Sequence, residues 1–202
     1  MLLGNARKKP PHGFSLIELL VALVIGMIVM ASVATTFTTQ TRAYSAQEQI
    51  NQMEQNARGA LDIMSREIKM AGYRPNGGSV TGVVSYSSTS LTIQADLDAD
   101  GAISLSGSDN EQITYAYDSV NNKITRQIGT ATAATLAENI SGFTFTYYKA
   151  TGSSLATSAT DIRRIKIALT AKTEKPDPGY QSNGGHRTVD LSAIITPINL
   201  GL

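Results

Sequence analysis

The sequence contains no cysteine and no tryptophan, and its only histidines are His12 and His186. Without cysteine the chain has neither a disulfide framework nor thiolate ligands for a metal ion. With two histidines it also lacks most of the side chains that catalytic and zinc sites use. No G-x-S-x-G, H-E-x-x-H or G-x-x-x-x-G-K segment occurs, which removes the usual hydrolase and nucleotide-binding motifs. We therefore expect that the chain is not an enzyme and requires no cofactor.

Charge is sparse and unevenly distributed. Charged residues make up 16% of the chain, and the formal net charge is +1. No basic surface is indicated, so nucleic acid is not an expected partner. Residues 1–13 carry Arg7, Lys8 and Lys9 and no acidic residue, whereas acidic residues outnumber basic ones in the remainder. This distribution predicts that residues 1–13 are a separable leader rather than part of the fold.

Proline is absent between Pro11 and Pro75, and neither lysine nor arginine occurs between Lys9 and Arg42. This interval begins with a segment that is apolar from Phe14 to Ala34 with few interruptions. A helix needs about 20 residues to cross the hydrocarbon core of a bilayer. The sequence therefore predicts one membrane-spanning helix over residues 14–35. The preceding cations favour a cytoplasmic N-terminal side, which would place the rest of the chain in the periplasm.

Glu18 is an acidic residue inside this apolar segment. A carboxylate at the centre of a membrane helix costs about 2.5–3.5 kcal/mol on insertion scales, so such a residue is a functional candidate that needs a partner. The segment itself offers no lysine or arginine. A cut after Gly13 would create a new α-amino group on Phe14, and this amine is a candidate partner for Glu18.

The segment Lys-Lys-Pro-Pro-His-Gly-Phe-Ser-Leu-Ile-Glu, residues 8–18, resembles the prepilin peptidase site of type IV pilins and type II secretion pseudopilins. The resemblance implies cleavage between Gly13 and Phe14 and methylation of the new N-terminus at Phe14. It also implies that Glu18 pairs with the N-terminal amine of a neighbouring subunit. Many pilins have a proline inside the membrane helix, where the helix melts in the filament. This chain has only Gly26 and the threonine-rich residues 35–39 as weaker points.

Two other interpretations of the N-terminus remain open. In the first, the segment is an uncleaved signal anchor in which Glu18 lies near the membrane face by accident. In the second, it is an ordinary secretory signal peptide with a small-x-small site at Ser32-Val33-Ala34. The acidic residue within the apolar core, and the helical pattern that continues after it, argue against a signal peptide.

The second half of the predicted helix, residues 36–73, is amphipathic. Apolar residues recur at spacings of three and four, which is typical of one buried helix face. They are Ile50, Met53, Ala57, Leu61, Met64, Ile68 and Ala71. Gly72 is the expected stop. We expect this stripe to pack against the chain's own β domain, with a coiled coil to a partner as the alternative. Residues 52–73 resemble the PilW group of minor pilins, and the J-type pseudopilins of type II secretion share the same general plan.

After Gly78 the apolar period changes to two, which predicts β-strands with one exposed face. The alternating segments surround Leu91, Ile113, Phe143, Ile165 and Val189, and Asn121-Asn122 suggests a hairpin. Strands that follow one long helix predict an α+β fold, in which the helix packs on an antiparallel sheet in a globular domain over residues 79–202. The resemblance to pilins implies the same arrangement.

One segment of this domain carries ligand chemistry. Residues 96–101 form a D-x-D-x-D-G run, with carboxylates at Asp96, Asp98 and Asp100. This pattern matches the first half of an EF-hand calcium loop. The twelfth position is Gly107 instead of a glutamate, so Asp109 and Glu111 would have to take its place by folding back. The run is therefore either a hydrated acidic turn or a calcium-binding loop.

The predicted function is that of a structural subunit, a minor pilin that primes or caps a type IV pilus. Its expected partners are prepilin peptidase, inner-membrane lipid and other major and minor pilins, which it would contact through the N-terminal helix. It would be an inner-membrane protein first and part of the pilus at the cell surface later. The alternatives are a pseudopilin of a type II secretion system and a calcium-dependent adhesin at a pilus tip.

Overall fold

The computed structural model describes residues 13–77, 80–105, 110–150 and 153–200. Within these ranges the chain forms one long helix, α1, which is followed by strands β1 to β8 and two 3-10 turns, η1 (Ala159–Asp161) and η2 (Ser182–Gly185). The chain divides into two compact units, Met1–Ala46 and Gln47–Leu202. The second unit is called the head below, and each unit is described by itself.

Helix α1 runs from Leu16 to Lys69 and comprises 54 residues. The helix can be this long because no proline, which would break or kink it, occurs between Pro11 and Pro75. A short turn ends the helix, and Gly72 has a φ of +79°, a conformation that suits glycine and commonly stops helices. The end lies within a few residues of the expected stop. The helix is also continuous through Gly26 and the threonine-rich residues 35–39.

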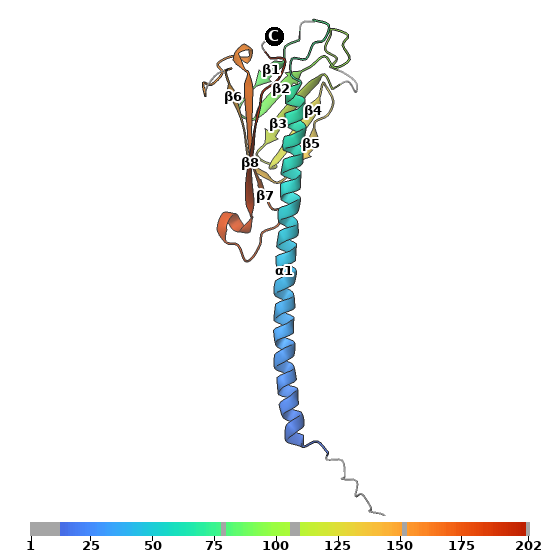
Figure 1. The fold of residues 1–202 in the computed structure, drawn as a ribbon, viewed down its shortest axis with the longest axis vertical. Helices are drawn as coiled ribbons and strands as arrows, with labels where there is room; N and C mark the ends of the chain where they lie inside the picture. The colour runs from blue at the N-terminus through green and yellow to red at the C-terminus, as the bar shows by residue number, and fades with distance from the viewer. Residues whose placement is uncertain (1–12, 78–79, 106–109, 151–152, 201–202) are drawn as a thin grey trace, which may run out of the picture. The chain divides into compact units, whose positions relative to one another are not determined.

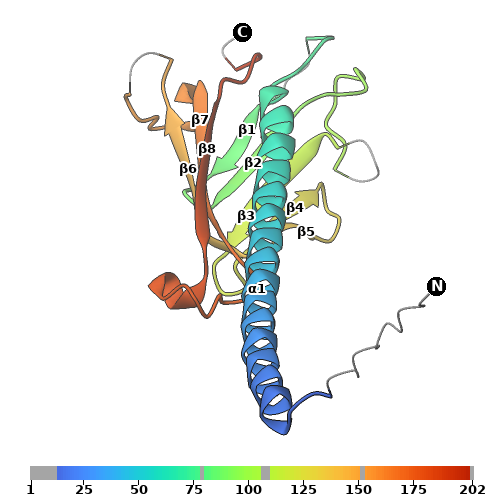
Figure 2. The same ribbon diagram turned by 60° about the horizontal axis from the view of Figure 1, so that its bottom comes forward.

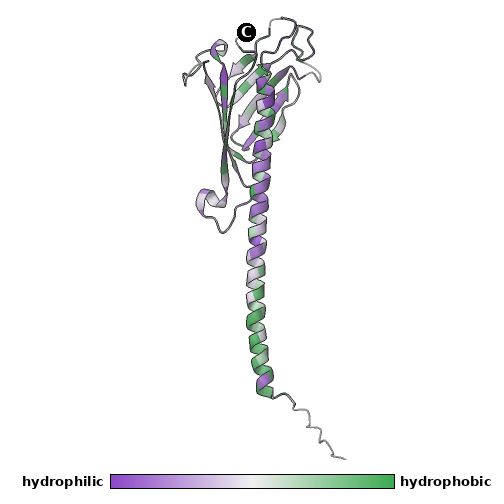
Figure 3. Ribbon diagram, in the orientation of Figure 1, coloured by the Kyte–Doolittle hydropathy of each residue, from purple (hydrophilic) through white to green (hydrophobic). Residues whose placement is uncertain are grey.

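In the first unit, the side chains of the helix from Leu16 to Ser45 are exposed on all sides. Figure 3 shows the apolar character of this part of α1, and an 18-residue window reaches a mean hydropathy of 2.7 with none of it buried. By length and composition, this helix can cross a membrane. The hydroxyls of Thr35, Thr36 and Thr39 donate to backbone carbonyls three or four residues earlier, so these polar groups are satisfied within the helix itself.

The head contains two antiparallel sheets (Figure 1). The five-stranded sheet has the order β1-β2-β3-β4-β5, and the three-stranded sheet has the order β6-β7-β8. The strands of the first are β1 (Val83–Tyr86), β2 (Ser90–Gln94), β3 (Gln112–Asp118), β4 (Lys123–Ile128) and β5 (Ala134–Ala137). Those of the second are β6 (Ile140–Tyr148), β7 (Arg164–Lys172) and β8 (Thr188–Ile195). Within each sheet, strands that follow one another in sequence therefore pair with one another.

The predicted alternating segments correspond to β2, β3, β6, β7 and β8, and the fold is α+β as expected. The predicted hairpin joins β3 to β4, where Asn122 has a φ of +51° and the Asp118 carboxylate accepts the Asn121 N–H at 3.0 Å. Two features differ from expectation. The strands form two sheets instead of one, and the short strands β1 and β5 lay outside the predicted set.

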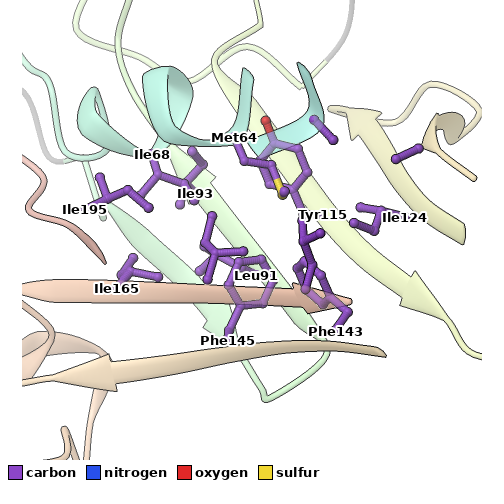
Figure 4. Close-up of a cluster of buried hydrophobic side chains, with 14 of the residues drawn as sticks. Met64, Ile68, Leu91, Ile93, Tyr115, Ile124, Phe143, Phe145, Ile165 and Ile195 are labelled. Carbon is purple, nitrogen blue, oxygen red and sulfur yellow. The ribbon is translucent and has the colours of Figure 1, made fainter. Parts of the chain in front are cut away.

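The core lies between the head part of α1 and the two sheets (Figures 2 and 4). The helix buries one stripe in it, which comprises Met53, Ala57, Ala60, Met64 and Ile68, and Ala71 in the turn after the helix is buried with them. From the sheets, Leu91 and Tyr115 meet Phe145 and Ile165 in the same cluster. The stripe therefore packs against the chain's own strands, as the sequence predicted. Ala60 belongs to it in addition, while Ile50 and Leu61 are only partly buried.

A polar link also joins α1 to the five-stranded sheet. The Arg126 guanidinium on β4 donates to both carboxylate oxygens of Glu67, at 2.7 and 3.0 Å, and the Tyr115 hydroxyl on β3 donates to the same carboxylate. Burial and this hydrogen bond raise the pKa of the Tyr115 phenol well above its usual range. The phenol therefore stays protonated and keeps its donor role at neutral pH.

Candidate functional site

The predicted cleavage site lies immediately before the helix. Gly13, Phe14 and Ser15 have no regular secondary structure and are exposed, and Phe14 exposes 87% of its surface. Exposed backbone outside helices and strands is where proteolysis concentrates. The Gly13–Phe14 peptide bond is therefore accessible to a peptidase without prior unwinding of α1, which begins at Leu16.

Glu18 lies in the first turn of α1, and its side chain is exposed. Its carboxylate accepts a long hydrogen bond of 3.4 Å from the Ser15 backbone N–H. A glutamate three residues after a serine is the second half of a capping box, and a negative charge is favourable at a helix N-terminus. Glu18 thus has a local structural role that the sequence analysis missed, although the S-x-x-E spacing of Ser15 and Glu18 was the available signal.

The acidic loop joins β2 to β3. Asp96 follows the end of β2 and is 0% exposed, whereas Glu111 precedes β3 and is 1% exposed. Asp98 and Asp100, between them in sequence, are exposed. Asp109 lies outside the described residues. Although Glu111 is 15 positions after Asp96, both carboxylates lie at the same end of the paired strands, because β2 and β3 are adjacent and antiparallel.

Backbone N–H groups hold the two buried carboxylates. One oxygen of Asp96 accepts the Gly101 N–H at 3.1 Å. The two oxygens of Glu111 accept the Leu97 N–H at 2.9 Å and the Ser104 N–H at 2.7 Å. Gly101 has a φ of +85°, which glycine adopts without strain. Glu111 therefore folds back onto the D-x-D-x-D-G run from outside it.

Three of the five residues that were predicted as calcium ligands lie close together in the structure. Asp96, Asp98 and Glu111 each place one carboxylate oxygen within 4.8 Å of the other two. Asp100 lies outside this group and accepts the Ala102 N–H at 2.8 Å. The hydrogen bond from the Asp100 N–H lowers the pKa of Asp98, but desolvation and the negative charges of Asp100, Glu111 and Asp96 outweigh it, so this pKa is raised.

His186, the histidine of the head, makes a structural contact with the backbone. The Nδ1 atom of His186 lies 2.7 Å from the Thr173 carbonyl oxygen. This contact fixes the ring beside the start of β8, so His186 needs no catalytic or metal-binding role to account for it.

Comparisons with known proteins cover both parts of the chain. Residues 8–34 match the prokaryotic N-terminal methylation motif. Residues 46–189 match the family described as prepilin peptidase-dependent protein B. A search among curated proteins gave no match. Among solved structures, a type IV-like pilin from Thermus thermophilus is similar, with a TM-score of 0.50 and 14% sequence identity over 73% of this chain and 97% of that pilin. At this identity the likeness concerns the fold.

Proposed function

Because the chain belongs to the family of prepilin peptidase-dependent protein B, we propose that this type IV pilin-like protein is a minor pilin that primes or caps the assembly of a type IV pilus. The observation that carries the proposal is one helix with two different surfaces. Its N-terminal part follows the Gly13-Phe14 motif and exposes apolar side chains all around, whereas its C-terminal part is buried on one face in the head. An exposed apolar surface of that extent requires lipid or protein around it.

The proposed sequence of events follows from the N-terminal residues. The helix first holds the subunit in the inner membrane, with the head on the periplasmic side. Prepilin peptidase then cuts between Gly13 and Phe14 and releases the leader, and the amine of Phe14 is methylated. In the filament, this amine of one subunit meets the Glu18 carboxylate of another. Two charges that are costly alone in an apolar environment then neutralise each other at the subunit contact.

The finer assignment to the PilW-like group of minor pilins rests on residues 52–73 and is part of the proposal. A pseudopilin of a type II secretion system is the second candidate, because the same N-terminal motif serves both assemblies. A deletion strain separates the two. Loss of twitching motility with normal secretion supports the pilus role, and the reverse phenotype supports the secretion role.

The processed N-terminus provides the direct test of the processing step. We expect the native protein, isolated from membranes or filaments, to begin at Phe14 and to carry an N-methyl group, which mass spectrometry of the N-terminal peptide will detect. The matched control is a strain without prepilin peptidase, in which the chain should keep residues 1–13. A native N-terminus at Thr35 would instead identify a signal peptide cut after Ala34, and it would contradict the proposal.

A further inference from the structure

We propose that Asp96, Asp98 and Glu111, beside the paired ends of β2 and β3, provide the carboxylate ligands of a calcium site. The proposal concerns the head alone and does not depend on the assembly role. Its starting point is the distance between the ligand atoms. Two oxygens that bind the same Ca²⁺ ion at about 2.4 Å can be at most about 4.8 Å apart. The three carboxylate oxygens lie within 4.8 Å of one another, so every pair of them is close enough to share one ion.

The second observation is an unpartnered oxygen in the protein interior. Asp96 is 0% exposed, and its Oδ1 atom has no hydrogen-bond partner among the described residues, although Oδ2 accepts the Gly101 N–H. A buried carboxylate oxygen without a partner is costly because it has lost its hydration shell. The cost increases when a second buried carboxylate, Glu111, lies close by. A cation bound between them removes both penalties.

The chemistry of the donors selects the ion. All three side chains offer hard carboxylate oxygens, and neither nitrogen nor sulfur belongs to the set. Such donors favour calcium or magnesium over zinc and other transition metals. Magnesium demands near-ideal octahedral geometry with shorter bonds, whereas calcium accepts irregular arrangements and six to eight ligands. Calcium is therefore the ion that this all-carboxylate set accommodates with the fewest geometric demands.

The backbone contacts of the loop indicate what the ion would stabilise. The Asp96 N–H donates to the Tyr73 carbonyl at 2.9 Å, and the Gly72 N–H donates to the Gln94 carbonyl at 2.8 Å. The Asn76 side chain donates to the Ala99 carbonyl. The acidic loop is thus tied to the segment that follows α1. A bound ion would hold together the end of the helix and the β2–β3 connection.

The test uses the mature full-length protein in detergent micelles, with calcium as the probe. Isothermal titration calorimetry should detect binding with a Kd of about 10⁻⁴–10⁻³ M, the range of extracellular calcium modules. In about 10 mM calcium, the Tm of the head, followed through the near-ultraviolet circular dichroism of its tyrosines, should rise by roughly 3–10 °C. Magnesium at the same concentration should give a smaller shift.

Two variants locate the site. Asp98→Asn keeps an oxygen for the Asp100 N–H and should weaken calcium binding at least tenfold. Asp96→Asn removes the buried negative charge, so in calcium-free buffer its Tm should equal or exceed that of the wild type, and calcium should no longer raise it. The matched control is Asp118→Asn, because Asp118, the last residue of β3, is a partly exposed aspartate that also accepts backbone N–H groups. Its calcium response should be unchanged.

Several results would overturn the proposal. If calcium produces neither heat nor a Tm shift in the wild type, the run is a hydrated acidic turn held by its own backbone. If Asp96→Asn and Asp98→Asn both respond to calcium like the wild type, the ion binds elsewhere or only non-specifically. If magnesium shifts the Tm as much as calcium does, the site is not a calcium site.

Discussion

Glu18→Gln is expected to lower incorporation of the subunit into filaments at least tenfold while cleavage after Gly13 continues. In the proposed contact, the Glu18 carboxylate cancels the charge of a neighbour's N-terminal amine in apolar surroundings. Removing the carboxylate leaves that amine unpaired, at a cost of about 2.5–3.5 kcal/mol by insertion scales. Since 1.4 kcal/mol corresponds to a factor of ten, the expected loss exceeds tenfold. The amounts of subunit in sheared filaments and in membranes, compared by immunoblot, measure the effect.

Glutamine is the informative replacement because the structure assigns Glu18 a second task. Its carboxylate accepts the Ser15 N–H as part of a capping box, and glutamine performs this task equally well. Glu18→Gln therefore removes the charge and keeps the cap, whereas Glu18→Ala removes both. If the glutamine variant enters filaments normally and only the alanine variant fails, the cap is what matters and the pairing with the amine is wrong.

A second glutamate on the same helix serves as the control. Glu48 is exposed and lies beyond the apolar segment, so Glu48→Gln should be incorporated like the wild type. Mass spectrometry of the N-terminus must accompany both variants. If Glu18→Gln keeps residues 1–13, the carboxylate acts at the peptidase and not at the subunit contact.

The helix was predictable because its signals are contiguous. The absence of proline between Pro11 and Pro75, the apolar segment from Phe14 and the stop at Gly72 can all be recognised in short windows of sequence. The buried stripe was predicted for the same reason. The prediction differs from the structure at Ala60, which it left out, and at Ile50 and Leu61, which are only partly buried. Hydrophobicity favoured the leucine, but Ala60 is 2% exposed and Leu61 only partly buried, although both positions fit the spacing of three and four between Ala57 and Met64.

The division of the strands into two sheets was not predictable in the same way. Strands β1 and β5 are four residues each, and both include exposed positions, so neither carries a strong alternating pattern. Which strands share a sheet depends on contacts between segments far apart in sequence. The acidic cluster shows the same limit. The motif at Asp96–Gly101 was visible, but only the pairing of β2 with β3 brings Glu111 back to it.

Ile68→Ala is expected to destabilise the head by about 2–5 kcal/mol. Ile68 is 0% exposed and packs in the core between α1 and the sheets (Figure 4). Truncation of such a side chain removes its buried apolar surface and leaves a cavity. For a protein of this size the Tm should fall by roughly 5–15 °C. Thermal unfolding of the mature full-length protein in micelles, followed through its tyrosines, measures the change.

Ile63→Ala is the control that separates the effect of burial from the effect of the isoleucine-to-alanine change itself. Ile63 is on the same helix but is 41% exposed, so its truncation should cost less than about 1 kcal/mol. Both variants make the same chemical change and gain the same helix propensity, since alanine forms helices better than isoleucine. The difference between them therefore isolates burial against the strands. If the two variants were equally stable, α1 would not be docked on the head, and a filament built through this helix would have no firm connection to the domain it carries.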